Sequence, residues 1–215
     1  MRCDGNAGNS FPTRRSSDLK RVIDLIFSFV LIIILSPLFA IISIIVLIGL
    51  GRPVFFVQKR VTLHEKEFSI IKFRTMKLEK DESGNVLTLE ERKSRVGDIL
   101  RSFSVDELPE LFNIFKGDLS FVGPRPLYKE YIPYYSDEER KRKDVRGGLI
   151  PPDCFEGKVS VTWDEQLKWE AWYAENVSFT NDIKVVLLTI LWRAPPLEMR
   201  RERREFFPYT TLFRS

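Results

Sequence analysis

The apolar stretch from Leu25 to Gly51 constrains the fold more than any other part of the chain. It contains no charged residue and consists mostly of Ile, Leu, Val and Phe. A straight helix of this length would be about 40 Å long, which is enough to cross a lipid bilayer with some tilt. Composition therefore predicts a membrane helix, and by itself it favours a single transmembrane anchor.

Two further features favour a re-entrant helix, which enters and leaves the membrane by the same face. Pro37, preceded by Ser36, lies near the middle of the stretch, where a proline removes one backbone donor and kinks a helix. Each half is then roughly 20 Å long and reaches only the interior of the bilayer. Basic residues flank both ends: Lys20, Arg21, Arg52, Lys59 and Arg60. Because positive residues favour the cytoplasmic side, we predict a kinked re-entrant helix over residues 20–51.

The two ends of the chain can be encoded by one nucleotide string that is read in two frames. Residues 11–19 are FPTRRSSDL and residues 207–215 are FPYTTLFRS. The string TTTCCCTACACGACGCTCTTCCGATCT encodes the second segment, and it encodes the first when reading starts a base later. We therefore interpret residues 1–19 as a tail derived from a sequencing adapter, and residues 194–215 as a tail of uncertain frame that ends in the same adapter. Both are left out of the fold prediction.

The remaining chain has the size of one domain. The formal net charge of +4 falls to about +2 without residues 1–19, which hold three Arg and two Asp, and without Arg214. So small an excess gives no sign of a nucleic-acid partner. Outside the tails, Cys154 is the only cysteine and His64 the only histidine, which excludes a disulfide framework and argues against zinc.

Residues 53–61 and 67–76 are rich in β-branched and aromatic residues and flank a short polar segment, a pattern that predicts a β-hairpin. The hairpin carries four basic residues: Lys59, Arg60, Lys72 and Arg74. Their positions leave two interpretations open, contacts with lipid headgroups and binding of substrate phosphates. A charged loop over residues 79–95 then leads into a short amphipathic helix over residues 95–103.

Residues 163–192 are predicted to form two helices separated near residues 176–181. The first carries an aromatic face: Trp163, Leu167, Trp169, Trp172, Tyr173 and Val177. Aromatic amphipathic helices often lie in the membrane interface, although an ordinary pair of core helices fits the pattern equally well. The predicted fold class is therefore α+β and mainly helical, a monotopic membrane protein with a re-entrant helix, a short β-hairpin and interfacial amphipathic helices.

Asp106 and Glu107 are adjacent carboxylates that stand just before Pro109. The simplest interpretation is structural: Asp106 caps a helix that has the proline in its first turn and ends at Gly117. Ser104 and Glu107 also have the spacing of a capping box. Taken alone, the pair is more typical of a helix cap than of a catalytic site.

The surroundings of the acid pair also allow a catalytic interpretation. A helix N-terminus favours bound anions, and Lys72, Arg101 and Arg125 would add positive charge if folding brings them close. Two carboxylates among such groups suit phosphoryl transfer, in which one carboxylate attacks phosphorus and the other holds Mg²⁺. The acid pair is therefore a candidate for both roles at once.

A series of motifs occurs in one order along the chain: Lys20-Arg21-x-x-Asp24, Ser36-Pro37, Phe55-Phe56-x-Gln58-x-Arg60, Lys72-Phe73-Arg74-Thr75-Met76, Leu100-Arg101-x-x-Ser104-x-Asp106-Glu107-Leu108-Pro109 and residues 117–127, GDLSFVGPRPL. This series resembles the bacterial sugar transferases, the small monotopic phosphoglycosyl transferases that start glycan assembly. The resemblance is close over residues 20–144, and it implies a re-entrant helix broken at Ser36-Pro37 and a cytosolic catalytic domain over residues 52–193.

The resemblance also implies a reaction. Members of the family transfer a sugar-1-phosphate from a UDP-sugar to polyprenyl (undecaprenyl) phosphate at the cytosolic face of the bacterial inner membrane, with Mg²⁺. Asp106 matches the nucleophile that forms a covalent phosphosugar intermediate and expels UMP, and Glu107 matches the acid that binds the metal. Four basic residues are the candidates for binding phosphates: Lys72, Arg74, Arg101 and Arg125.

The sequence departs from the family pattern mainly after Val145, where it reads VRGGLIPPDCFEGKVSVTW, so the sugar stays open. Glu110 stands where the family more often has Gln, a change expected to matter little. Two other functions also stay open: a membrane-tethered phosphohydrolase that uses the same acid pair, and a non-catalytic membrane scaffold in which Asp106 only caps its helix. The oligomeric state cannot be predicted from the sequence.

Overall fold

The computed structural model describes residues 14–80, 83–156 and 161–193. Its α-helices are α1 (Arg14–Leu50), α2 (Leu89–Arg92), α3 (Arg95–Ser102), α4 (Glu110–Lys116), α5 (Trp163–Glu175) and α6 (Phe179–Arg193). Its strands are β1 (Phe55–Val61), β2 (Glu67–Phe73), β3 (Ser120–Val122) and β4 (Gly148–Ile150), and short 3₁₀ turns connect several of these elements. The predicted mainly helical fold with a short hairpin is confirmed.

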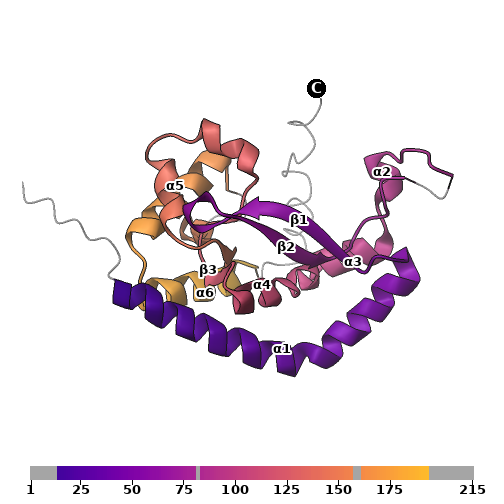
Figure 1. Cartoon of the computed structure of the whole chain (residues 1–215), viewed down its shortest axis with the longest axis horizontal. Helices are drawn as coiled ribbons and strands as arrows, with labels where there is room; N and C mark the ends of the chain where they lie inside the picture. The colour runs from indigo at the N-terminus through magenta and orange to yellow at the C-terminus, as the bar shows by residue number, and fades with distance from the viewer. Residues whose placement is uncertain (1–13, 81–82, 157–160, 194–215) are drawn as a thin grey trace, which may run out of the picture.

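Helix α1 runs without interruption through Pro37, and Figure 1 shows it as two arms that meet at a bend. Proline has no amide hydrogen, so the Ile33 carbonyl loses the donor that position 37 would otherwise supply. The Ser36 hydroxyl donates to that carbonyl at 2.8 Å and replaces the missing bond. The Ser-Pro pair therefore bends the helix without leaving a backbone acceptor bare, which matters where no water is present.

The predicted hairpin is confirmed. Strands β1 and β2 pair antiparallel in a register that sets Phe55 opposite Phe73 and Val61 opposite Glu67. In Figure 1 the hairpin lies above α4, and α1 runs along the lower edge of the molecule. Phe68 and Ile70 of β2 pack with Leu111 and Ile114 of α4, and side chains of α1 close this cluster from the other side. The hairpin, α4 and α1 thus form a stack around one hydrophobic core.

The predicted helix that starts at an Asp106 cap is wrong at its N-terminus. Residues Val105–Glu107 form a 3₁₀ turn, Ser104 has a positive φ of 55° and makes no side-chain cap bond, and α4 begins only at Glu110. Pro109 has no N–H to donate to the Val105 carbonyl, so an α-helical turn cannot close there. The Leu108 amide donates to that carbonyl at 3.3 Å instead, as in a 3₁₀ turn. The predicted end of α4 at Gly117, with φ 99°, is confirmed.

The C-terminal part packs around a short parallel pair of strands, β3 and β4. Helices α5 and α6 are separated between Glu175 and Phe179, as predicted, and Val122, Tyr173 and Val185 form their shared core. The aromatic face expected on α5 is divided. Tyr173 is buried, as the core interpretation expects, whereas Trp163 and Trp172 are exposed, and their place in a membrane interface stays a prediction.

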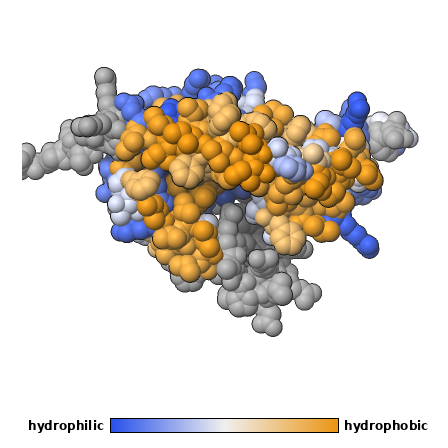
Figure 2. Space-filling view, turned by 90° about the horizontal axis from the view of Figure 1, so that it is seen from below, coloured by the Kyte–Doolittle hydropathy of each residue, from blue (hydrophilic) through white to orange (hydrophobic). Residues whose placement is uncertain are grey.

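An apolar surface covers the side of the molecule on which α1 lies (Figure 2). Large apolar side chains of α1 are exposed on it, among them Ile34 at 65% and Ile48 at 82%. Over Asp18–Leu50 the helix is long enough and apolar enough to cross a membrane, judged by length and composition. One charged group of α1 is instead turned into the protein: Asp24 is buried and accepts from the Phe121 amide at 3.3 Å.

Residues 14–19, which belong to the predicted N-terminal tail, form the first turns of α1. The origin of this tail in an adapter stays a prediction. The predicted C-terminal tail over residues 194–215 lies outside the described residues.

Candidate active site

The acid pair lies on the 3₁₀ turn between α3 and α4, and apolar packing holds that turn in place. Val105 and Leu108, on either side of the acids, pack against a cluster that contains Phe73 of β2 and Leu100 of α3. The two carboxylates between them are left half-buried. The turn therefore presents Asp106 and Glu107 beside the end of strand β2.

Lys72 is the cation that joins this turn to the hairpin. Its ammonium lies 2.8 Å from the Glu107 carboxylate and 3.1 Å from the Glu110 carboxylate. Burial acts to lower the pKa of Lys72, but the two carboxylates outweigh burial and the pKa is raised. Lys72 is thus held in its charged form between the carboxylates of Glu107 and Glu110.

Glu110 is a member of the site that sequence reasoning passed over. It is 3% exposed, and burial first, then repulsion from Glu107, raises its pKa to about 7, while Lys72 and Arg125 act in the opposite direction. The signal was available in its spacing: residues three apart share a helix face, so a helical turn through residues 107–110 places both glutamates on one side. The site is a three-carboxylate cluster around one lysine.

Asp106 shares this electrostatic environment. Burial, and then the neighbouring Glu107 carboxylate, raise its pKa above the ordinary aspartate value, whereas Lys72 and Arg101 act to lower it. Partial loss of water makes a carboxylate more reactive than one in bulk solvent, while the cations Lys72 and Arg101 favour its charged form. The prediction that folding brings Lys72 and Arg101 near Asp106 agrees with these interactions.

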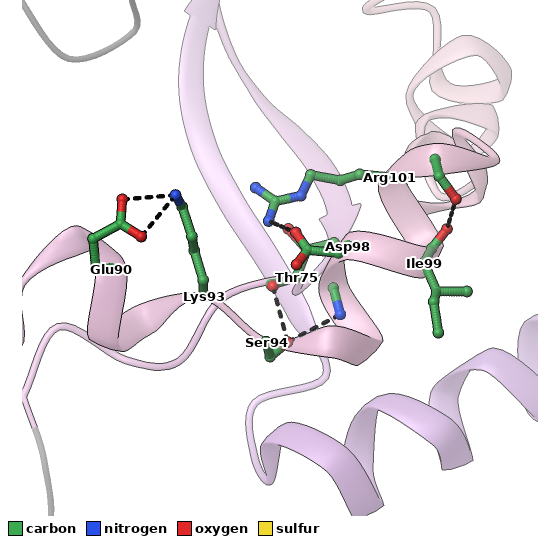
Figure 3. Close-up of polar contacts among 9 residues, drawn as sticks. Thr75, Glu90, Lys93, Ser94, Asp98, Ile99 and Arg101 are labelled. Carbon is green, nitrogen blue, oxygen red and sulfur yellow. Dashed lines mark hydrogen bonds and ion pairs between the residues drawn. The ribbon is translucent and has the colours of Figure 1, made fainter. Parts of the chain in front are cut away.

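Arg101 approaches the site from α3 and pairs with Asp98 at 3.0 Å (Figure 3). The position of α3 is set at its N-terminus, where the Ser94 hydroxyl accepts from the Gly97 amide at 2.9 Å and donates to the Thr75 carbonyl at 3.4 Å. A Cβ at Gly97 would lie 1.7 Å from that carbonyl oxygen. Only glycine lets α3 pack this closely on the segment that follows β2.

Arg74 takes a different place from the other predicted basic residues. It is 5% exposed and donates to the carbonyls of Leu50 and Gly51, both at 2.6 Å. These carbonyls end α1, so Arg74 ties α1 to the hairpin. Its predicted role in phosphate binding stays a prediction, and its described hydrogen bonds give it a structural role.

Arg125 stands between Pro124 and Pro126 on the segment after β3. Its positive charge acts on Glu110 and opposes the rise in that residue's pKa. The four candidate cations therefore divide. Lys72, Arg101 and Arg125 act on the acid cluster, and Arg74 is held at the end of α1.

The donor set suits Mg²⁺ that arrives with a phosphorylated substrate. Within the residues that the structure describes, no group of three or more His, Cys, Asp or Glu is arranged to hold a metal ion without further ligands. Mg²⁺ is commonly held by one or two carboxylates together with substrate phosphates and water. Glu107 supplies a hard oxygen donor of this kind, so it fits a metal whose other ligands come from the substrate and water.

A family model and individual relatives place this chain among the same proteins. The family model for bacterial sugar transferases matches residues 15–194. An uncharacterized sugar transferase of Bacillus subtilis, EpsL, is 40% identical over 172 residues, which are 80% of this chain and 85% of EpsL. The undecaprenyl-phosphate galactose phosphotransferase of Salmonella typhimurium is 31% identical over 84% of this chain and 41% of its own length.

A third relative is the UDP-glucose:undecaprenyl-phosphate glucose-1-phosphate transferase of Caulobacter vibrioides, which is 30% identical over 80% of this chain and 68% of its own length. The family indicated by the ordered motifs is therefore the family found by comparison. With the family model matching nearly all of the described residues, the protein belongs to the bacterial sugar transferases.

Proposed function

We propose that this protein transfers a sugar-1-phosphate from a UDP-sugar to polyprenyl (undecaprenyl) phosphate and releases UMP. The observation that carries the proposal is the acid cluster of Asp106, Glu107 and Glu110 around Lys72. Relatives named as undecaprenyl-phosphate sugar phosphotransferases support it. The product would begin an exopolysaccharide, capsule, O-antigen or glycoprotein glycan.

In the first step, a carboxylate oxygen of Asp106 attacks the phosphorus that bears the sugar. A bond forms between aspartate and phosphorus, the bond from that phosphorus to the bridging oxygen breaks, and UMP leaves with the electron pair. The result is an acyl phosphate that carries the sugar. In the second step, an oxygen of the lipid phosphate attacks the same phosphorus and displaces Asp106, which regenerates the carboxylate.

The cations of the site stabilise the negative charge that gathers on the phosphate oxygens in both steps. Lys72 reaches the cluster from β2, Arg101 from α3 and Arg125 from the segment after β3. Mg²⁺, held by Glu107 together with phosphate oxygens, would supply further neutralisation when bound. Glu110 keeps Lys72 in place, because it is the second carboxylate that the ammonium contacts.

The lipid substrate explains why the site stands on a membrane helix. We propose that α1 is re-entrant, with its bend at Ser36-Pro37 in the bilayer and both ends on the cytosolic face of the bacterial inner membrane. The exposed apolar side chains of α1 support this placement (Figure 2). A reagent that labels cysteines from one side only should modify single cysteines placed before Lys20 and after Gly51 equally. Labelling of one of them alone would show a spanning helix.

The reaction is tested with the full chain in detergent, offered a panel of UDP-sugars. We expect UMP release, and after omission of the lipid phosphate a peptide containing Asp106 whose mass has increased by one phosphosugar. Adding polyprenyl phosphate should remove that mass and yield the lipid-linked sugar. Release of sugar-1-phosphate to water without lipid product would indicate the phosphohydrolase. No UMP release with any UDP-sugar would contradict the proposed reaction.

A further inference from the structure

The segment Pro124–Arg125–Pro126 is held from behind by a buried ion pair. Pro124 and Pro126 have no amide hydrogen, so the amide of Arg125 is the only backbone donor in the three residues. This amide donates to the Glu170 carboxylate at 2.8 Å. The Arg125 carbonyl accepts from the Arg142 guanidinium at 2.5 Å. Both polar groups of this main-chain residue are thus held by side chains from elsewhere in the chain.

The two side chains that hold Arg125 are bonded to each other. Arg142 contacts the second carboxylate oxygen of Glu170 through Nε at 2.8 Å and through Nη2 at 2.6 Å. Gln166, one helical turn earlier on α5, donates to the first carboxylate oxygen at 2.9 Å. All partners described for the Glu170 carboxylate therefore donate hydrogen bonds to it. These donors fix the orientation of the carboxylate.

Burial makes this arrangement unusual among the ion pairs described. Glu170 is 0% exposed and Arg142 is 7% exposed. A buried ion pair contributes little net stability compared with apolar residues of the same size, because both charges lose their water. The planar guanidinium of Arg142, whose donors point in fixed directions, is however well suited to fixing position, because it bonds the Glu170 carboxylate and the Arg125 carbonyl at once. The pair connects α5 and the 3₁₀ turn Glu139–Asp144 to a segment beside the acid cluster.

We propose that Glu170 and Arg142 are positioning residues for the transferase reaction: they fix the main chain of Arg125 so that its guanidinium is directed at the acid cluster and meets a phosphate oxygen of the substrate. This inference rests on the proposed function. It assigns α5 a role in catalysis that is exerted through Arg125, without contact with substrate. A displacement of about 1 Å at a phosphate-binding group is enough to slow a reaction of this kind strongly.

The test is a double-mutant cycle with Glu170→Gln and Arg125→Ala, measured as kcat and KM for the UDP-sugar that gives the fastest UMP release. Glutamine has the shape of glutamate but only one acceptor oxygen, so its NH₂ group must face a donor. We expect Glu170→Gln to lower kcat about 10- to 50-fold, and Arg125→Ala about 100-fold. The double variant should be no slower than Arg125→Ala, because the guanidinium that Glu170 positions is already absent.

A purely structural role predicts another result: the two losses would multiply in the double variant, and this would overturn the proposal. An unchanged kcat in Glu170→Gln would overturn it as well. The matched control is Glu175→Gln, which removes the exposed pair of Glu175 with Lys141 at 2.8 Å. That pair joins the same helix to the same turn without touching Arg125, so kcat should stay at the wild-type value.

If thermal unfolding shows that Glu170→Gln does not fold, the same cycle is run with Arg142→Lys. Lysine keeps the charge, but it cannot hold the Glu170 carboxylate and the Arg125 carbonyl with one planar group. The fall in kcat caused by Arg142→Lys should also disappear in the Arg125→Ala background. If the two falls in kcat multiply instead, the proposal is again overturned. Wild-type enzyme without UMP release would contradict the proposed function itself, whereas an active wild type with multiplying losses contradicts only the positioning role.

Discussion

Two prolines of this chain interrupt a helix with opposite results. At Pro37 the helix continues, because the Ser36 hydroxyl bonds the Ile33 carbonyl that proline leaves without its amide donor. At Pro109 the helix does not continue toward the N-terminus. The chain forms the turn Val105–Glu107 instead, and α4 starts at Glu110.

The difference lies in the surroundings of the two prolines. Pro37 is embedded in an apolar helix, where an unsatisfied backbone group is costly and a helix is the form that satisfies most of them. Pro109 follows two carboxylates that face Lys72, so polar side chains stabilise a turn that exposes them. One proline therefore shapes the long apolar helix and the other shapes a candidate active site, and substitutions around each should affect different measurements.

The largest effect is expected at the turn before Pro109. Asp106→Asn keeps the size of the side chain but removes the proposed nucleophile, so transfer to lipid phosphate should fall more than about 10³-fold. The variant should also show no phosphosugar adduct in intact-protein mass spectrometry. Asp137→Asn, at an exposed position, is the control and should transfer at the wild-type rate. Wild-type transfer by Asp106→Asn would mean that the turn has no catalytic role.

The next effect concerns the cation that holds the turn. Lys72→Met removes the partner of Glu107 and Glu110, so uncompensated negative charge remains at the proposed phosphate site, and transfer should fall about 100-fold. Lys116→Met is the matched control. Its ammonium lies 3.0 Å from Asp118 on the exposed end of α4, and its loss should leave the rate unchanged. Equal rates for both lysine variants would contradict a phosphate-binding role for Lys72.

A smaller effect is expected in the pH dependence of stability. Glu110 releases its proton near pH 4.5 in the unfolded chain but near pH 7 in the folded protein. The folded state therefore binds more protons between these values, and stability falls as the pH rises through this window. Glu110→Gln removes this pH dependence. The difference in free energy of unfolding, variant minus wild type, should therefore rise by about 1–3 kcal/mol from pH 4.5 to 7. A constant difference across this range in denaturant titrations would show that Glu110 does not titrate there.

The smallest effect is expected at the bend of α1. Ser36→Ala leaves the Ile33 carbonyl without the described donor and should lower stability in detergent by about 1 kcal/mol. In a Pro37→Ala background an amide hydrogen returns at position 37, and the cost of Ser36→Ala should disappear. Ser43→Ala is the control, because its hydroxyl bonds the Phe39 carbonyl in a helix that keeps its amides. An equal cost of Ser36→Ala in both backgrounds would contradict the role of Ser36.

Much of the fold could be predicted from local signals. The uncharged stretch specifies a helix, the β-branched runs around Thr62 a hairpin, and the glycine at position 117 the end of α4, and these elements are confirmed; the re-entrant course of the helix stays a prediction. The start of α4 was predicted incorrectly because Asp106 and Ser104 have good capping chemistry. Two effects outweigh this capping chemistry. Pro109 lacks the amide that a helical turn would need, and Lys72 of β2 forms an ion pair with Glu107, a long-range contact that no local pattern contains.

The sequence named most residues of the candidate site, but it predicted only part of how they are arranged. The ordered motifs named Asp106, Glu107, Lys72, Arg101 and Arg125 as a group, and they also named Arg74, whose described hydrogen bonds are with the end of α1. Glu110 was considered a minor departure, although folding buries it against Lys72. Whether a charged residue belongs to the site depends on which side chains lie beside it in the folded protein. Those neighbours are set by the packing of the whole chain.

The sequence by itself determined the long apolar helix with its proline, the hairpin, the two C-terminal helices and the family, because periodicity, composition and ordered motifs are local. Only the tertiary structure decided three other features: the turn that presents the acid pair, the separation of Arg74 from the other cations, and the buried Arg142–Glu170 pair behind Arg125. These depend on contacts between residues far apart in the chain, whose electrostatic energies are set by distance and by exclusion of water.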